Sequence, residues 1–237
     1  MTGLVRKATL LCVGGALLAG AAMAGVPNST NSTISGASMA LGTGCITISD
    51  VPSMASCVPL VIRDANNNPV AGASVVLDFS TCPSGDVKIC STQSPQGTTI
   101  GSLGTQSATA ICGPSYTVTV AADALGQVCV IPNGGTNLAF GHSPAASRPT
   151  CCRIYADSQL LTTTVVTVSS YDLNSTGTVT SGDLSVWLLT YFGGGTYRSK
   201  GDYNCTGTVN SGDLAQWLAG FGAASGGAPV GCTSFCP

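Results

Sequence analysis

The chain has 237 residues, a formal net charge of −2 and only 8% charged residues. Its eight basic residues form no patch, which excludes the classes of nucleic-acid-binding protein that depend on clustered Lys and Arg. The single histidine, His142, is the one conventional base that a serine or cysteine nucleophile could use, and its turn-rich surroundings favour a surface loop. We therefore predict a protein that is not an enzyme.

A polysaccharide hydrolase is the remaining catalytic alternative, because paired carboxylates can cleave glycosidic bonds. Most of the candidate carboxylates lie in or beside turn-like segments, where Asp is favoured because its side chain bonds the local backbone. These candidates are Asp50, Asp64, Asp78, Asp86, Asp123 and Asp157.

Residues 1–24 have the features of a secretory signal. Arg6 and Lys7 precede an apolar stretch that ends in Ala22-Met23-Ala24, an A-x-A cleavage pattern. The stretch is short and interrupted by glycine, so we expect no stable membrane insertion after cleavage. The protein is predicted to be secreted, to the extracellular space or the cell surface.

Residues 25–44 are rich in Ser, Thr, Asn, Gly and Ala, with few large apolar side chains. Such a composition buries too little surface to order itself, so a flexible arm or linker is predicted.

Residues 45–170 contain short β-type runs separated by turns, with no amphipathic helix between them. A segment of this length and pattern is typical of an antiparallel β-sandwich. The stretches DANNNPVAGASVVLDFS, at 64–80, and ADALGQVCV, at 122–130, resemble bacterial Ig-like domains of extracellular proteins. The resemblance implies a mainly β fold with an Ig-like sandwich.

Eleven cysteines remain after the signal, and export makes disulfides the expected state. The odd number leaves one thiol free or paired with another chain. Zinc is the competing explanation, but the chain has no C-x-x-C pair and one histidine. Cys82 and Cys90 bracket a Pro-Ser-Gly-Asp turn, and a local bridge between them is the first pairing that we predict.

Two further cysteine groups suggest pairings without deciding them. The adjacent Cys151 and Cys152 are expected to serve two different partners, and Cys205 is a candidate to bond Cys232 or Cys236. The latter bridge would fasten the tail, residues 224–237, to the segment before it.

The most informative feature is a 12-residue pattern that occurs twice, DLNSTGTVTSGD at 172–183 and DYNCTGTVNSGD at 202–213. Oxygen-bearing side chains occupy positions 1, 3, 5, 9 and 12, and glycine occupies position 6, which is the pattern of an EF-hand-type calcium loop. Turn formation without an ion is the alternative, but four of the ten Asp residues stand at positions 1 and 12. The expected ligands are Asp172, Asn174, Thr176, Thr178, Thr180 and Asp183, and, in the second loop, Asp202, Asn204, Thr206, Thr208, Asn210 and Asp213.

Each loop is followed by apolar residues at helical spacing, which repeat position for position at an offset of 30 residues. Residues 171–223 therefore resemble a dockerin type I module. The resemblance implies about two structural calcium ions in sites related by pseudo-two-fold symmetry, and a docking function with a cohesin-like partner. The chain departs from the family at position 5, which is Thr in both loops, and at positions 10 and 11, which are Ser-Gly in both.

The sequence thus predicts a secreted, non-catalytic, calcium-binding protein that mediates protein–protein docking. The alternative is a structural subunit of an extracellular fibre or surface layer that assembles with copies of itself. In that case, the arm at 25–44 could add a strand to a neighbouring sheet.

Overall fold

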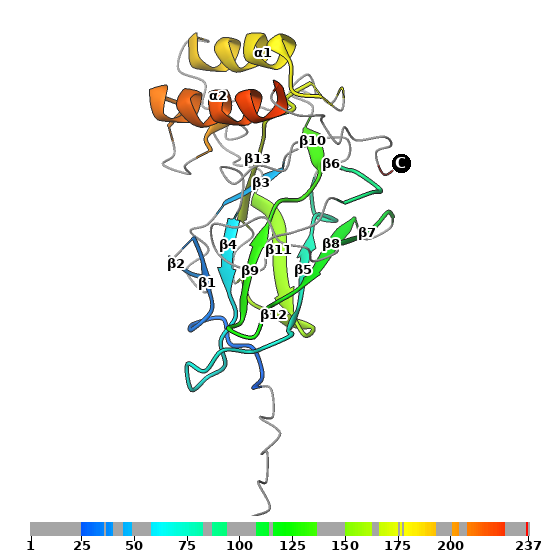
Figure 1. Ribbon diagram of the computed structural model, residues 1–237, viewed down its shortest axis with the longest axis vertical. Helices are drawn as coiled ribbons and strands as arrows, with labels where there is room; N and C mark the ends of the chain where they lie inside the picture. Colours follow the sequence, from blue (N-terminus) through cyan, green and yellow to red (C-terminus); the bar gives the residue numbers. More distant parts are fainter. Residues whose placement is uncertain are drawn as a thin grey trace, which may run out of the picture.

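The computed structural model shows a mainly β protein with two helices (Figure 1). It describes residues 25–35, 37–39, 45–48, 58–82, 87–93, 108–113, 116–136, 150–162, 166–174, 176, 178–192, 201–203, 208–225 and 236. The predicted signal at 1–24 lies outside these residues. Neither α1 nor α2 combines the length and the hydropathy that a transmembrane helix needs.

The strands of the described residues form three sheets. The four-stranded sheet has the order β2-β1-β4-β9, and β10 pairs with β6. The seven-stranded sheet has the order β3-β13-β11-β5-β8-β7, with β12 paired to β11. The strands are β1 Thr33–Ile34, β2 Ala37–Ser38, β3 Cys45–Ile48, β4 Val58–Val61, β5 Ser74–Asp78, β6 Val87–Ile89, β7 Thr109–Ile111, β8 Thr117–Ala121, β9 Gln127–Val130, β10 Gly134–Thr136, β11 Thr150–Ala156, β12 Gln159–Leu160 and β13 Val166–Ser170.

One hydrophobic core lies between the larger sheets. Alternation along β5 buries Val75 and Leu77 while their neighbours face outward, as expected for a strand with one face on a core. From the four-stranded sheet, Leu60 and Val128 join the same cluster. Almost every pair of strands is antiparallel, as predicted, but β13 runs parallel to β3, with Val168 opposite Ile46.

The described part of the predicted flexible arm is folded, which is a correction to the sequence interpretation. Thr33 pairs with Val61 of β4, and Ile34 and Met39 are fully buried in the core. Two apolar side chains at the right positions are enough to dock the polar segment, because its backbone finds hydrogen bonds in an existing sheet.

The disulfides differ from the local pairings that the sequence suggested. Cys82 bonds to Cys151 rather than to Cys90, and Cys112 bonds to Cys236, so Cys236 is not the partner of Cys205. Cys90 and Cys129 are also disulfide-bonded.

The expectation that Cys151 and Cys152 have two different partners is wrong, because Cys152 is a free, buried thiol. Cys151 and Cys152 are both buried in the core of the β part, next to an irregularity in the pairing of β11 with β13. Cys205 and Cys232 lie outside the described residues.

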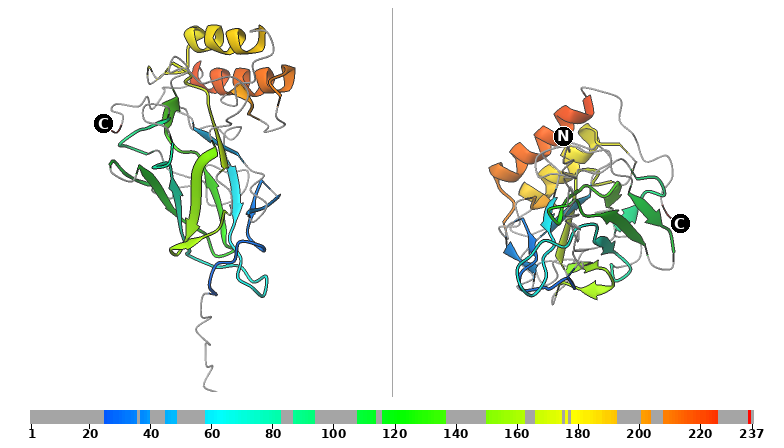
Figure 2. Two further views of the ribbon diagram at one scale, coloured as in Figure 1. Left: turned by 180° about the vertical axis from the view of Figure 1, so that it is seen from behind. Right: turned by 60° about the horizontal axis from the view of Figure 1, so that its bottom comes forward.

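The helices are α1, Ser181–Phe192, and α2, Ser211–Ser225. They lie side by side at one end of the β part, next to β10 and the end of β13 (Figures 1 and 2). Strand β13 ends at Ser170, two residues before the first predicted calcium loop, so the core strand leads directly into that loop.

Candidate calcium loops and the two-helix module

Each predicted loop ends in a capping box at the start of its helix. In the first loop, the Thr180 hydroxyl accepts a hydrogen bond from Gly182 N at 3.2 Å, and Asp183 Oδ2 accepts one from Thr180 N at 2.8 Å. In the second, Asn210 Oδ1 accepts from Gly212 N at 2.7 Å, and Asp213 Oδ2 accepts from Asn210 N at 2.9 Å. Positions 9 and 12 therefore satisfy backbone N–H groups that a helix start leaves without partners.

The second oxygen of each position-12 carboxylate closes the loop. Asp183 Oδ1 accepts from Leu173 N at 2.8 Å and from Asn174 N at 3.1 Å. Asp213 Oδ1 accepts from Tyr203 N at 2.8 Å, the corresponding bond 30 residues later. Each position-12 residue thus brings the beginning of its loop against the first turn of its helix.

The position-1 residues are not part of the capping boxes. Asp172 and Asp202 are nevertheless fully buried, as are Asp183 and Asp213. Asp172 Oδ1 accepts a hydrogen bond from Thr176 N at 3.1 Å. Burying a carboxylate is costly unless its charge is compensated. Helix capping explains why Asp183 and Asp213 stand at their positions, but it does not explain the two buried position-1 residues.

The remaining predicted ligands differ in how far the structure describes them. Asn174 is half-buried, and its Oδ1 accepts from Thr176 N at 3.2 Å. Thr176 and Thr178 are exposed, and the Thr176 hydroxyl donates to Thr178 O at 3.2 Å. In the second loop, Thr208 is exposed, whereas Asn204 and Thr206 lie outside the described residues, as do both position-6 glycines.

The donor set suits a hard cation. The described loop residues offer carboxylate, amide, hydroxyl and carbonyl oxygens, which calcium prefers. The hydrogen bonds to Asp183 come from backbone N–H groups and a hydroxyl. None of these donors carries a positive charge, so they do not neutralise the negative charge of the carboxylate. Within the described residues, no three His, Cys, Asp or Glu side chains form a cluster, as expected where each loop carries two carboxylates. We conclude that the residues fit a calcium ion whose other ligands are neutral oxygens.

The tryptophan of each repeat donates a hydrogen bond to the other repeat. Trp187 of α1 donates its indole N–H to Gly201 O at 3.2 Å, just before the second loop. Trp217 of α2 donates to Tyr171 O at 3.3 Å, just before the first loop. Both tryptophans are fully buried, and the two acceptor residues are themselves 30 positions apart. This reciprocal exchange is the relation that a pseudo-two-fold axis between the repeats would produce.

Aromatic packing extends the repeated pattern. Trp187 stacks on Tyr191 with ring centroids 5.3 Å apart, and Trp217 stacks on Phe221 at 5.2 Å. Trp187 and Trp217 belong to one small core, which is distinct from the core of the β part, and Phe221 packs against it, whereas Tyr191 is 44% exposed. Most of the apolar residues at helical spacing therefore face this core, but Tyr191 and Leu218 remain exposed.

The repeat is broken where the module meets the β part. The second loop has Tyr203 where the first has Leu173, and the Tyr203 hydroxyl donates to Ser170 O of β13 at 2.9 Å. Its ring stacks on Tyr171 at 4.9 Å. Burial, together with the nearby Tyr171 ring and the Asp183 and Asp213 charges, raises the pKa of Tyr203 well above its ordinary value. The side chain therefore remains a neutral hydrogen-bond donor.

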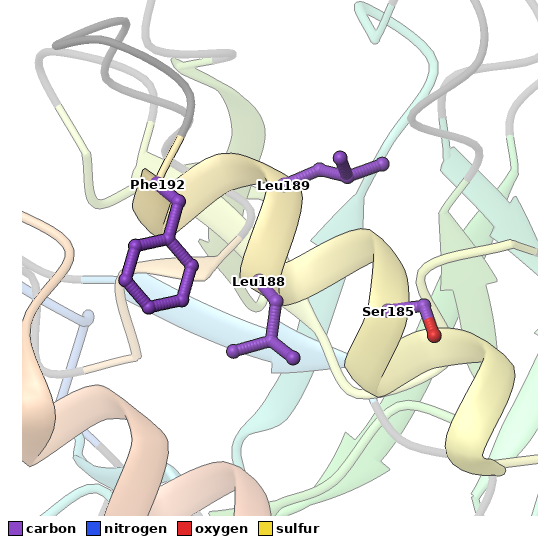
Figure 3. Close-up of a pocket in the computed structure, with 4 residues that line it drawn as sticks. All are labelled: Ser185, Leu188, Leu189 and Phe192. Atoms are coloured by element: carbon purple, nitrogen blue, oxygen red, sulfur yellow. The ribbon is translucent and has the colours of Figure 1, made fainter.

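A second difference between the repeats creates an apolar surface on α1. Leu189 is 67% exposed and Phe192 is 74% exposed, whereas the equivalent residues of α2 are Ala219 and Gly222. An open pocket of about 420 Å³ is lined by Ser185, Leu188, Leu189 and Phe192. Figure 3 shows Leu188 and Phe192 projecting from one side of the helix and Leu189 from another. The periodic pattern alone did not reveal this surface, but a comparison of the two repeats could have done so.

The carboxylates considered for hydrolysis mostly bond their local backbone. Asp64 Oδ1 accepts from Asn66 N at 2.9 Å, and Asp123 Oδ1 accepts from Leu125 N at 2.8 Å, as the turn interpretation predicted. Asp78 and Asp157 also accept backbone hydrogen bonds. His142, Asp50 and Asp86 lie outside the described residues.

No protein-family model matches this chain, and no match is found among curated proteins or among solved structures.

Proposed function

We propose that this is a secreted, non-catalytic protein in which two calcium ions order a dockerin-like module that docks on another protein. In this proposal, the β part is an Ig-like sandwich that carries the module. The observation that carries the proposal is the pair of matching loops, each with two fully buried carboxylates, one of which has no role in helix capping.

The exposed face of α1 supports docking. Leu189 and Phe192 are large apolar residues whose counterparts in the second repeat are small, so the fold of the module does not require them. Apolar residues that are exposed together around a pocket commonly mark a protein-binding site. The proposed partner is a protein with an apolar contact surface, and a cohesin-like domain is the kind that the resemblance implies.

The alternative of a self-assembling fibre or surface-layer subunit has less support. The described part of the arm already pairs with β4 of its own chain, so it does not offer a free strand to a neighbour. The free thiol in the described residues is buried, so it is poorly placed for a bond between chains.

The test is a calorimetric calcium titration of the mature, oxidised protein, with the mass in solution measured with and without calcium. We expect about two ions per chain and a monomeric mass. Growth of the mass with calcium would favour self-assembly, and an absence of calcium binding would refute the proposal.

The docking face is tested separately with the double variant Leu189→Ser, Phe192→Ser. We expect it to keep calcium binding and thermal stability but to lose calcium-dependent capture of a partner from extracellular material. The matched control is Leu125→Ser, which changes a 57% exposed leucine in a turn of the β part. Equal capture by wild type and the double variant would exclude α1 as the docking face.

A further inference from the structure

Strand β10 passes directly behind the first position of the first loop. A Cβ atom placed on Gly135 would lie 2.5 Å from Asp172 Oδ2, 3.0 Å from Asp172 Cγ and 3.3 Å from Asp172 O. Any side chain at residue 135 would therefore have to displace the Asp172 carboxylate, and it would crowd the Asp172 carbonyl oxygen. Glycine is therefore required by the close approach of the two segments.

We propose that Gly135 is a positioning residue for the first calcium site, and that calcium binding there is coupled to the β6–β10 sheet. The inference rests on the proposed calcium function and adds a specific link between the metal and the β part. The Gly135 backbone lies against Oδ2, while the loop holds Oδ1 through Thr176 N. A carboxylate confined on both sides loses less conformational freedom when an ion binds.

The sheet behind Asp172 is itself firmly held, so it cannot easily retreat from an added side chain. Gly135 pairs with Lys88 of β6, and Ile89 of the same strand is buried in the core. Ile89 O also accepts a hydrogen bond from Cys236 N at 2.7 Å, and Cys236 is joined to Cys112 by a disulfide. Displacement would therefore fall mainly on Asp172 and its loop.

The link makes the two calcium sites unequal. Asp202 is the counterpart of Asp172, but the three atoms nearest to a Cβ at Gly135 all belong to Asp172. The second repeat contacts the β part in another way, through the Tyr203 hydroxyl and Ser170 O. A change at Gly135 is thus expected to act on one site of the two.

The experiment compares wild type with Gly135→Ala in the full-length oxidised protein by calorimetric calcium titration. The matched control is Gly222→Ala, because a Cβ at Gly222 meets no atom within 4 Å. An alanine at residue 135 would overpack a confined site. We therefore expect the affinity of the protein for one of the two calcium ions to fall by about tenfold or more. The affinity for the other ion is expected to stay within about twofold of wild type, because the atoms nearest to a Cβ at Gly135 all belong to the first loop.

A second measurement does not depend on the folding of the variant. Amide hydrogen exchange of residues 134–136 in wild type is expected to become slower when calcium is added. If bound calcium leaves the exchange of these amides unchanged, the coupling is wrong. It is also wrong if Gly135→Ala leaves both calcium affinities unchanged or lowers both equally. Failure of wild type to bind calcium at all would instead refute the proposed function, so the two failures are distinguishable.

Discussion

Replacement of both position-1 carboxylates, Asp172→Asn with Asp202→Asn, distinguishes a calcium site from a turn that merely needs Asp. Asparagine keeps the size and one acceptor oxygen, so the bond from Thr176 N to residue 172 can persist. The capping boxes of Asp183 and Asp213 are untouched. The variant therefore removes one negative charge from each loop and little else.

The expected effect changes sign with calcium. At free calcium about 100-fold above the dissociation constant, binding stabilises the folded module by about 2.7 kcal/mol per site, or about 5 kcal/mol for two sites. A variant that no longer binds at this concentration loses that stabilisation. In chelator, the same variant is expected to be at least as stable as wild type, because it buries two fewer negative charges.

Urea unfolding followed by tryptophan fluorescence measures this effect in the relevant part of the molecule. Both tryptophans of the chain, Trp187 and Trp217, are buried in the core of the two-helix module. The charge-matched control is Asp123→Asn with Asp157→Asn, since each of these accepts a backbone hydrogen bond in the β part. Equal destabilisation of the loop variant in calcium and in chelator, or identical unfolding of wild type in both, would contradict a calcium site in these loops.

Three further changes test individual contacts. Trp187→Phe removes the indole bond to Gly201 O and is expected to lower the unfolding free energy of the module in urea by about 1–3 kcal/mol, because it leaves a buried carbonyl without its partner. Tyr203→Phe removes the bond to Ser170 O and should cost about 1 kcal/mol, measured in the same way; no loss would show that the bond contributes nothing. Burial and the nearby Asp78 charge raise the pKa of the Cys152 thiol. Its stabilising contribution is therefore complete below the unfolded thiol pKa of about 8.5 and is lost as pH rises toward the folded value, so Cys152→Ala should flatten the alkaline decline of stability measured by urea unfolding.

Local sequence patterns predicted the helical module well. The 30-residue repeat placed two helices after the two loops, and the structure has α1 from Ser181 and α2 from Ser211. The prediction succeeded because capping residues and apolar spacing act within a few residues of each other. The calcium ligands remain predictions, with both carboxylates of each loop buried as an ion site would require.

The sequence also predicted short strands separated by turns in residues 45–170, since alternation and turn signals are local. The order of those strands was not predicted. The parallel pairing of β13 with β3 and the docking of Thr33–Ile34 on β4 join segments that lie far apart in the chain. No residue pattern within either strand specifies its neighbour.

The cysteines show the same division. Their number and the expected export predicted disulfides and an unpaired thiol, whereas proximity in sequence suggested Cys82 with Cys90. The structure joins Cys82 to Cys151, 69 residues away, because disulfide geometry depends on the distance between Cα atoms in the folded chain.

The sequence by itself determined the composition of this protein's elements: strands, two capped helices and two oxygen-rich loops, each set by interactions within about one turn or one hairpin. The tertiary structure decided which residues of different elements come into contact and which remain exposed. It placed the backbone of Gly135 against Asp172 and the hydroxyl of Tyr203 on Ser170, and it left Leu189 and Phe192 exposed on α1. Such contacts and exposed surfaces depend on residues that lie far apart in the chain, so they are known only once the chain is packed.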